Sequence, residues 1–179
     1  FPEWLAGIAD VLNSGQRGWL SACHNLRSLC LLLHDDQMRR FYEQSNDCYV
    51  DGVSVRLILY GFGIRTNGQQ RFSLMDHFLE LLEHAEKNHW SIFYLGSRES
   101  AVTVGRAMIN KIFPELRIQL HHGFNSEVPA LLQSINDFRP DILLVGMGMP
   151  LQERWLVDHR ELLDVGFMAQ AGSTLDYYT

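Results

Sequence analysis

Asp51 and a glycine-rich turn about a hundred residues later carry the residue types in this sequence that best suit chemistry. Asp51 follows the short apolar run Cys48 to Val50 and precedes Gly52. A carboxylate held at the end of a strand can act as a general base, which removes a proton from an attacking hydroxyl group. Asp-Gly is also a common turn pair, so the residue types alone leave a purely structural role open.

The glycine-rich turn lies within the stretch Asp141 to Trp155. This stretch begins with Ile142 to Val145, which has the length and composition of a strand buried on both faces. Gly146, Gly148 and Pro150 follow, and a helical pattern begins directly after them. Such a strand, turn and helix N-terminus is where open α/β sheets bind ligands, phosphates among them. An ordinary turn without a ligand remains the alternative.

The second half of the chain alternates between strand and helix patterns. Strands are predicted at 92–95, 118–120, 142–145 and 165–170, and helices at 101–113, 128–138 and 152–163. This alternation predicts a Rossmann-like open parallel sheet with helices on both faces. Four turns would then share the carboxyl edge of the sheet and line one crevice: Gly96-Ser97, His122-Gly123, Gly146 to Gly148 and Gly172-Ser173.

The first half is predicted to add more helices and two short strands. Helices are expected at 1–14, 25–33, 35–45, 53–62 and 74–88, and strands at 19–23 and 48–50. The apolar segment 53–62 is expected to be buried, and Ser73 is expected to cap the helix that follows it. A polar loop is expected at 63–70. The whole chain, 1–179, is interpreted as one domain.

Composition narrows the possible functions. The 179 residues are 46% hydrophobic and 20% charged, with a net charge of −6, which argues against a nucleic-acid protein that binds through a broad basic face. The three cysteines form no CxxC pair, as is typical of a reducing cytoplasm. No apolar run approaches the length needed to span a bilayer.

Common catalytic and cofactor motifs are incomplete or absent. Gly146-Met147-Gly148 is followed by Leu151 where the dinucleotide fingerprint needs glycine, although an NAD-linked oxidoreductase stays as a rival. The sequence has no Walker A motif and no GxSxG. His121 and His122 are adjacent, so in a strand they would point to opposite faces and would not share a metal. We therefore predict no metal and no cofactor.

An ordered set of motifs carries a resemblance to a known family. The motifs are Asn25, Asp51-Gly52-Val53, Arg71 with Asp76, Phe93-Tyr94-Leu95-Gly96, His121-His122-Gly123-Phe124, Gly148-Met149-Pro150-Leu151-Gln152-Glu153-Arg154-Trp155, and Gly172-Ser173-Thr174-Leu175-Asp176-Tyr177. With these motifs the chain resembles the WecG/TagA/CpsF family of bacterial glycosyltransferases over nearly its whole length. It departs from the family pattern at Cys23, Ser54 and Leu74, where threonine, glycine and glycine are usual.

The resemblance implies an inverting, metal-independent transfer of a sugar from a UDP-sugar to a polyprenyl-diphosphate-linked acceptor. The sugar would be N-acetylmannosamine, its uronic acid, another hexose or glucuronate. Asp51 would be the catalytic base. Substrate binding would fall to Cys23, Asn25, Arg71, Asp76, His122, Gly123 and Phe124, and nucleotide binding to Gly96, Gly146, Gly148, Pro150, Gln152, Glu153, Gly172 and Ser173. A non-catalytic nucleotide- or sugar-binding module, with Asp51 as a turn residue, is the alternative.

The resemblance also implies a location. Family members work at the inner face of the cytoplasmic membrane, and a basic C-terminal tail helps to hold them there. Thr179 ends the sequence before any such tail, so we expect weak or absent activity from this polypeptide alone. A homo-oligomer that uses the apolar segment Leu57 to Phe62 is possible, although a core role for this segment is the simpler expectation.

Overall fold

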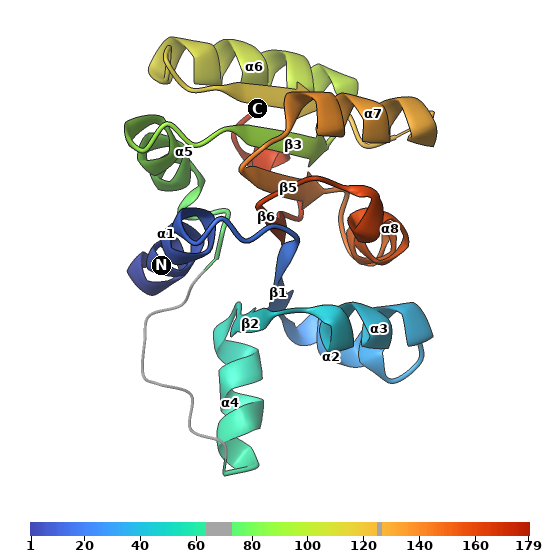
Figure 1. The fold of residues 1–179 in the computed structure, drawn as a ribbon. Coiled ribbons are helices and arrows are strands. Elements are labelled where there is room, and N and C mark those ends of the chain that lie inside the picture. Colours follow the sequence, from blue (N-terminus) through green and yellow to red (C-terminus); the bar gives the residue numbers. More distant parts are fainter. Residues whose placement is uncertain (64–72, 125–126) are drawn as a thin grey trace.

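The computed structural model describes residues 1–63, 73–124 and 127–179. Its centre is a six-stranded, all-parallel sheet with the strand order β2-β1-β6-β5-β3-β4 (Figure 1). The strands are β1 (Trp19–His24), β2 (Asp47–Val50), β3 (Ile92–Gly96), β4 (Ile118–His121), β5 (Ile142–Gly146) and β6 (Phe167–Gln170). The predicted Rossmann-like α/β fold is confirmed.

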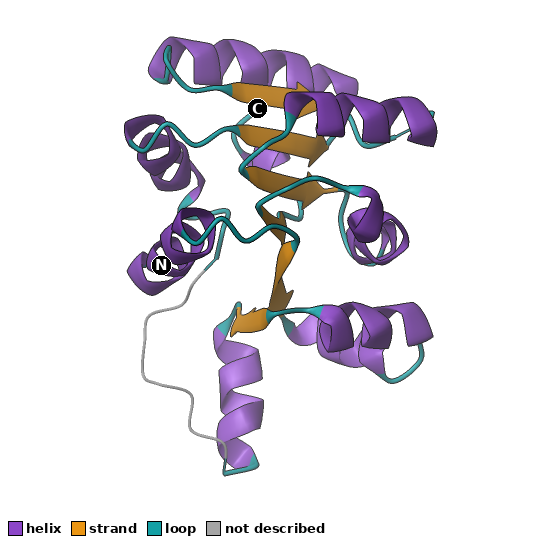
Figure 2. Cartoon of the chain, in the orientation of Figure 1, coloured by secondary structure: helices purple, strands orange, loops and turns teal. Residues whose placement is uncertain are grey.

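Helices cover both faces of this sheet (Figure 2). They are α1 (Pro2–Asn13), α2 (Leu26–Leu32), α3 (Asp36–Gln44), α4 (Val53–Gly61), α5 (Phe78–Lys87), α6 (Glu99–Ile112), α7 (Val128–Phe138), α8 (Leu151–His159) and α9 (Thr174–Tyr177), with the short 3₁₀ helix Arg160–Leu162 after α8. Side chains of α1, α5 and α6 form the core on one face, and side chains of α3, α7 and α8 form the core on the other. Neighbouring residues of a strand serve opposite cores, as Phe93 and Tyr94 do, because side chains alternate across a sheet.

The neighbouring strands β5 and β3 mark a change in the direction of the chain connections. They pair in register from Ile92 with Ile142 to Gly96 with Gly146. The helices that follow them, α6 and α8, pack on opposite faces of the sheet. Because the chain leaves these adjacent strands in opposite directions, a crevice opens at their carboxyl ends.

Helix α4 corrects one expectation. The segment was expected to be buried, but only Val55 is fully covered within it, while Leu57 is 65% and Phe62 80% exposed. The helix follows the edge strand β2 and projects away from the sheet (Figure 1). Its apolar composition therefore does not reflect a place in the core.

Several other elements also differ from expectation. Helix α5 begins at Phe78, and residues 74–77 form turns, so Ser73 is not its N-cap. The helix expected to run to Leu163 becomes a 3₁₀ turn after His159. The turn after β6 continues into α9, which the sequence analysis did not predict. The loop expected at 63–70 lies almost wholly outside the described residues.

None of the described helices combines the length and apolar character that crossing a bilayer requires.

Candidate functional site

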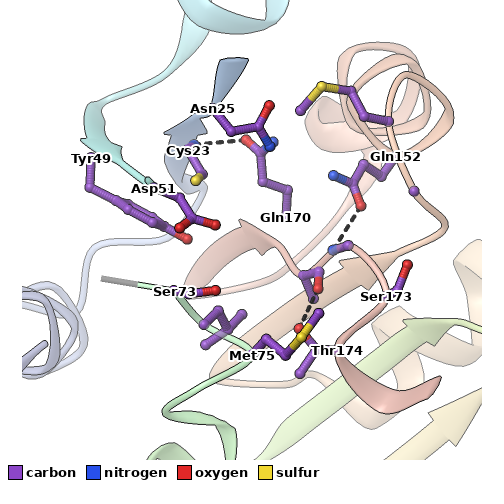
Figure 3. Close-up of a pocket in the computed structure, with 15 residues that line it drawn as sticks. Cys23, Asn25, Tyr49, Asp51, Ser73, Met75, Gln152, Gln170, Ser173 and Thr174 are labelled. Carbon is purple, nitrogen blue, oxygen red and sulfur yellow. Dashed lines mark hydrogen bonds between the residues drawn. The ribbon is translucent and has the colours of Figure 1, made fainter. Parts of the chain in front are cut away.

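Two adjoining cavities follow the carboxyl edge of the sheet. The first, here called the aspartate cavity, has a volume of about 250 Å³ and lies at the ends of β1, β2 and β6 (Figure 3). Its lining comprises Cys23, Asn25, Tyr49, Asp51, Ser73, Leu74, Met75, Gly148, Met149, Gln152, Gln170, Ala171, Gly172, Ser173 and Thr174. The second, the glycine cavity, has a volume of about 390 Å³ and is lined by Ser97, Arg98, Phe124, Gly146, Met147, Gly148, Ser173 and Asp176. Gly148 and Ser173 belong to both linings, so the cavities share a wall.

Asp51 holds a distinctive position in the aspartate cavity. It directly follows β2, and its backbone N–H donates a 2.7 Å hydrogen bond to the carbonyl oxygen of His24 at the end of β1. Gly52 has a φ of 103°, a conformation that favours glycine, and this turns the chain into α4 directly after Asp51. Among the described residues of the lining, Asp51 is the only one with a carboxylate. A proton acceptor thus stands among neutral polar groups.

Cys23 and Tyr49 lie beside this carboxylate (Figure 3). Cys23 is 7% exposed, and the Tyr49 hydroxyl lies close enough to its thiol to influence the pKa of both groups. Burial, and secondarily the charge of Asp51, raises the pKa of the Cys23 thiol far above neutrality. Burial likewise raises the pKa of the Tyr49 phenol. Both groups therefore stay neutral and can serve as hydrogen-bonding wall groups, but the Cys23 thiol is not suited to be a nucleophile.

Asn25 combines a local role with its place in the cavity. Its side-chain oxygen accepts a 3.0 Å hydrogen bond from the N–H of Ser28, while the Ser28 hydroxyl accepts one from the N–H of Asn25. This reciprocal arrangement is a capping box, which begins α2 at the end of β1. The cap fixes the orientation of the asparagine that lines the cavity.

Two of the predicted glycines serve close packing between strands. A Cβ atom on Gly96 would lie 2.7 Å from the Cα of Gly146, and one on Gly146 would lie 2.9 Å from the carbonyl oxygen of Gly172 and closer still to the Tyr94 hydroxyl. Gly148 differs, because a Cβ atom there would meet no atom within 4 Å, although its φ of 78° favours glycine. The backbone of Gly148 is open to both cavities.

Behind the aspartate cavity lies a buried network of three side chains, Gln152, Glu153 and Gln170. The two amide Nε2 groups each donate a 2.7 Å hydrogen bond to Oε1 of Glu153. Gln170 accepts a 2.8 Å hydrogen bond from the N–H of Cys23, and Gln152 accepts one of 3.0 Å from the N–H of Gly172. Burial raises the pKa of Glu153 to about 7. The network joins α8 to the ends of β1 and β6.

The glycine cavity has a different character. Ser97 and Arg98 lie at the N-terminus of α6, and Arg98 is the one cationic residue that the described chain contributes to either lining. Phe124 is 41% exposed and offers an aromatic surface. Asp176 contributes a carboxylate from α9. A cation, an aromatic ring and a helix N-terminus suit a nucleotide better than a sugar alone.

The two histidines of the predicted turn lie differently from expectation. Their rings are stacked with centroids 4.8 Å apart, rather than on opposite faces of a strand, because His122 lies beyond the last residue of β4. Nδ1 of His122 is hydrogen-bonded to the carbonyl oxygen of Phe124 at 2.8 Å, which supports the turn that presents Phe124. The described residues contain no group of three or more side chains arranged to hold a metal ion.

The structure brings most, but not all, of the predicted site residues together. The aspartate cavity takes Cys23, Asn25, Asp51, Gly148, Gln152, Gly172 and Ser173, and the glycine cavity takes Phe124, Gly146, Gly148 and Ser173. Asp76, Gly96, His122, Gly123, Pro150 and Glu153 lie outside both linings. Arg71 lies outside the described residues.

Several lining residues were not predicted. They include Tyr49, Ser73, Arg98, Gln170, Thr174 and Asp176. Gln170 had a detectable signal, since it is the one polar residue of the strand Phe-Met-Ala-Gln. The others are polar residues near strand ends and turns, and nothing in the pattern distinguishes them from ordinary surface positions.

Comparison of the chain with known proteins identifies relatives. The profile of the Glycosyl transferase WecG/TagA/CpsF family matches residues 1–179. N-acetylglucosaminyldiphosphoundecaprenol N-acetyl-beta-D-mannosaminyltransferase from Staphylococcus aureus strain NCTC 8325 / PS 47 is 31% identical over 106 residues, which are 59% of this chain and 41% of the relative. The enzyme of the same name from strain MRSA252 is 30% identical over the same shares. The matched segment thus covers less than half of these relatives.

Proposed function

Because the chain belongs to the WecG/TagA/CpsF family of glycosyl transferases, we propose that it transfers a sugar from a UDP-sugar to a polyprenyl-diphosphate-linked sugar acceptor. The observation that carries this proposal is the pairing of the two cavities. One holds a carboxylate among neutral polar groups, and the other, across a shared wall, holds the features that suit a nucleotide.

In this proposal Asp51 is the general base. An inverting transfer needs a group that takes the proton of the acceptor hydroxyl as that oxygen attacks the anomeric carbon of the donor, while the bond from that carbon to the diphosphate oxygen breaks and UDP leaves. The acceptor sugar would occupy the aspartate cavity, with Asn25 and the neutral Cys23 thiol beside it. Their hydrogen bonds would orient the hydroxyl toward the base.

The nucleotide of the donor would occupy the glycine cavity. Phe124 offers a surface on which a base can stack, and Arg98 with the N-terminus of α6 offers positive charge to the diphosphate. The backbone at Gly148 allows close approach, so the donor sugar would lie at the wall that the two cavities share. Arg71 is proposed as a further partner of diphosphate or acceptor.

The transferred sugar is proposed to be N-acetylmannosamine, its uronic acid, another hexose or glucuronate. The names of the Staphylococcus aureus relatives specify an N-acetylmannosaminyl group and an undecaprenol-linked acceptor. An acceptor of that kind is anchored in lipid, so the protein would work as a peripheral enzyme at the inner face of the cytoplasmic membrane.

The decisive experiment is Asp51→Asn, measured as transfer from a panel of UDP-sugars to a lipid-linked acceptor. We expect a loss of about 100-fold or more, which is typical for the removal of a general base. Asp47→Asn is the matched control, because Asp47 lies exposed at the start of β2, the strand that Asp51 follows, and outside both cavities. Transfer by a folded Asp51→Asn variant within about threefold of wild type would refute the base assignment. Binding of UDP-sugars without any transfer would favour a non-catalytic binding module.

A further inference from the structure

Glu153 is a buried acidic side chain that lines neither cavity yet lies at the centre of the hydrogen bonds behind them. It is fully buried in the first turn of α8. Its Oε1 accepts hydrogen bonds from Gln152 and from Gln170. Its Oε2 is also buried and has no hydrogen-bond partner among the described residues.

The carboxyl group decides which way both amides face. A side-chain amide has an oxygen that accepts and an NH₂ group that donates, and the two point in different directions. Because each NH₂ group donates to Glu153, each oxygen is directed the other way, toward a backbone N–H. Those two N–H groups belong to Cys23 in β1 and to Gly172 in the turn after β6, and both residues line the aspartate cavity.

We infer that Glu153 is a positioning residue for sugar transfer, which acts through Gln152 and Gln170 to hold the end of β1 and the Gly172 turn in register around the acceptor. This inference rests on the proposed function. Under this inference Glu153 does not touch the substrate itself, whereas its neighbour Gln152 lines the cavity.

The positioning role also depends on whether Glu153 carries a proton. Burial raises its pKa to about 7, while Gln152 and, more weakly, the charge of Arg27 act in the opposite direction. Asp35 adds repulsion but is itself paired with Arg154 at 2.7 Å.

Tyr42 of α3 lies close enough to Glu153 for its charge to influence the Tyr42 pKa, and His24 of β1 packs on Tyr42; both are neutral near pH 7. Burial raises the pKa of the Tyr42 phenol and lowers that of the His24 imidazole, and the two rings stack with centroids 3.9 Å apart. While Glu153 is protonated, the buried side chains behind the aspartate cavity carry no charge. Its ionisation adds a negative charge behind the aspartate cavity, which already holds the carboxylate of Asp51.

Two variants, compared with wild type, test the inference. Glu153→Gln keeps a neutral acceptor at the Oε1 position, whereas Glu153→Leu removes it. The first readout is amide hydrogen exchange at Cys23 and Gly172, with the β3 amide of Phe93 as an internal reference. For Glu153→Leu we expect exchange at both sites to be at least tenfold faster and the Phe93 amide to be unchanged. For Glu153→Gln we expect exchange within threefold of wild type at all three amides.

The second readout is the pH profile of kcat for transfer. We expect Glu153→Gln to match wild type within threefold at pH 6, and wild type to fall at least threefold relative to Glu153→Gln by pH 8.5. Glu153→Leu should lose at least tenfold in kcat at both pH values. Wild-type exchange in Glu153→Leu, or identical pH profiles for wild type and Glu153→Gln, would overturn the inference.

The two readouts are independent of each other. Hydrogen exchange involves neither nucleotide nor sugar, so it tests the positioning role even if the proposed function is wrong. If Glu153→Leu does not fold, the pH comparison between wild type and Glu153→Gln still decides the matter.

Discussion

The backbone N–H of Asp51 donates to the carbonyl oxygen of His24 at 2.7 Å, and this bond ties the end of the edge strand β2 to the end of β1. The contact extends the register that already pairs His24 with Val50. Asp51 is thereby held beside Cys23, although β2 has a neighbour on one side only. The backbone of two strands thus helps to fix the position of the proposed base.

The burial of Cys23 leads to a prediction about thiol reactivity. Because its pKa is raised and its side chain is 7% exposed, Cys23 should react with iodoacetamide at pH 8 at least ten times more slowly than the exposed Cys30. Peptide mass spectrometry after timed labelling measures both rates in one sample. Equal rates in the folded protein would contradict the neutral, inaccessible thiol, and equal rates in urea serve as the control.

A side chain at position 146 should destabilise the fold. A Cβ atom there would press on the Tyr94 hydroxyl and on the Gly172 carbonyl, so we expect Gly146→Ala to lower the free energy of unfolding by about 2 kcal/mol. Gly7→Ala is the matched control, because its Cβ would meet open space in helix α1, and we expect stabilisation of about 0.5–1 kcal/mol. Urea denaturation gives both values. A neutral Gly146→Ala would show that the close approach of β5 to Tyr94 is relaxed at little cost.

Glu153 should make stability depend on pH. The folded carboxyl group keeps its proton up to about pH 7, whereas an ordinary glutamic acid ionises near 4.5. Between these values the folded state binds more protons than the unfolded state, so the free energy of unfolding falls as the pH rises. The shift corresponds to a loss on the order of 3 kcal/mol between pH 4.5 and 8.

Urea denaturation at several pH values measures this dependence. Wild type should lose stability relative to Glu153→Gln as the pH rises through the window, while Glu43→Gln, at an exposed position, should follow wild type. Parallel curves for wild type and Glu153→Gln would mean that folding does not raise the pKa of Glu153.

Arg98 should matter for binding of the nucleotide. A charge-assisted hydrogen bond to phosphate contributes about 1.5–3 kcal/mol, so Arg98→Ala should weaken UDP binding about tenfold or more. Lys111→Ala removes a cation from the other end of the same helix and should leave UDP affinity unchanged. Calorimetric titration with UDP at two salt concentrations measures both. Unchanged affinity in Arg98→Ala would remove this residue from the nucleotide site.

The sequence predicted the parallel sheet and most of the glycine turns because those features depend on local periodicity and on single residue types. It could not predict that α4 is exposed, since an apolar helix is buried only if another element packs on it. It also could not place Glu153 behind the site. The network around Glu153 depends on the bond between Cys23 and Gln170, which are separated by 147 residues and meet only after β6 has paired with β1.

The wall shared by the two cavities has a consequence for how binding and reaction can be separated. Among the described residues, the two linings share Gly148, which has no side chain, and Ser173, whose side chain is small. Under the proposed function, the passage between donor and acceptor is therefore controlled by the size of one side chain. A larger side chain at position 173 should leave nucleotide binding intact but block transfer of the sugar. A single substitution could then change turnover without changing nucleotide affinity.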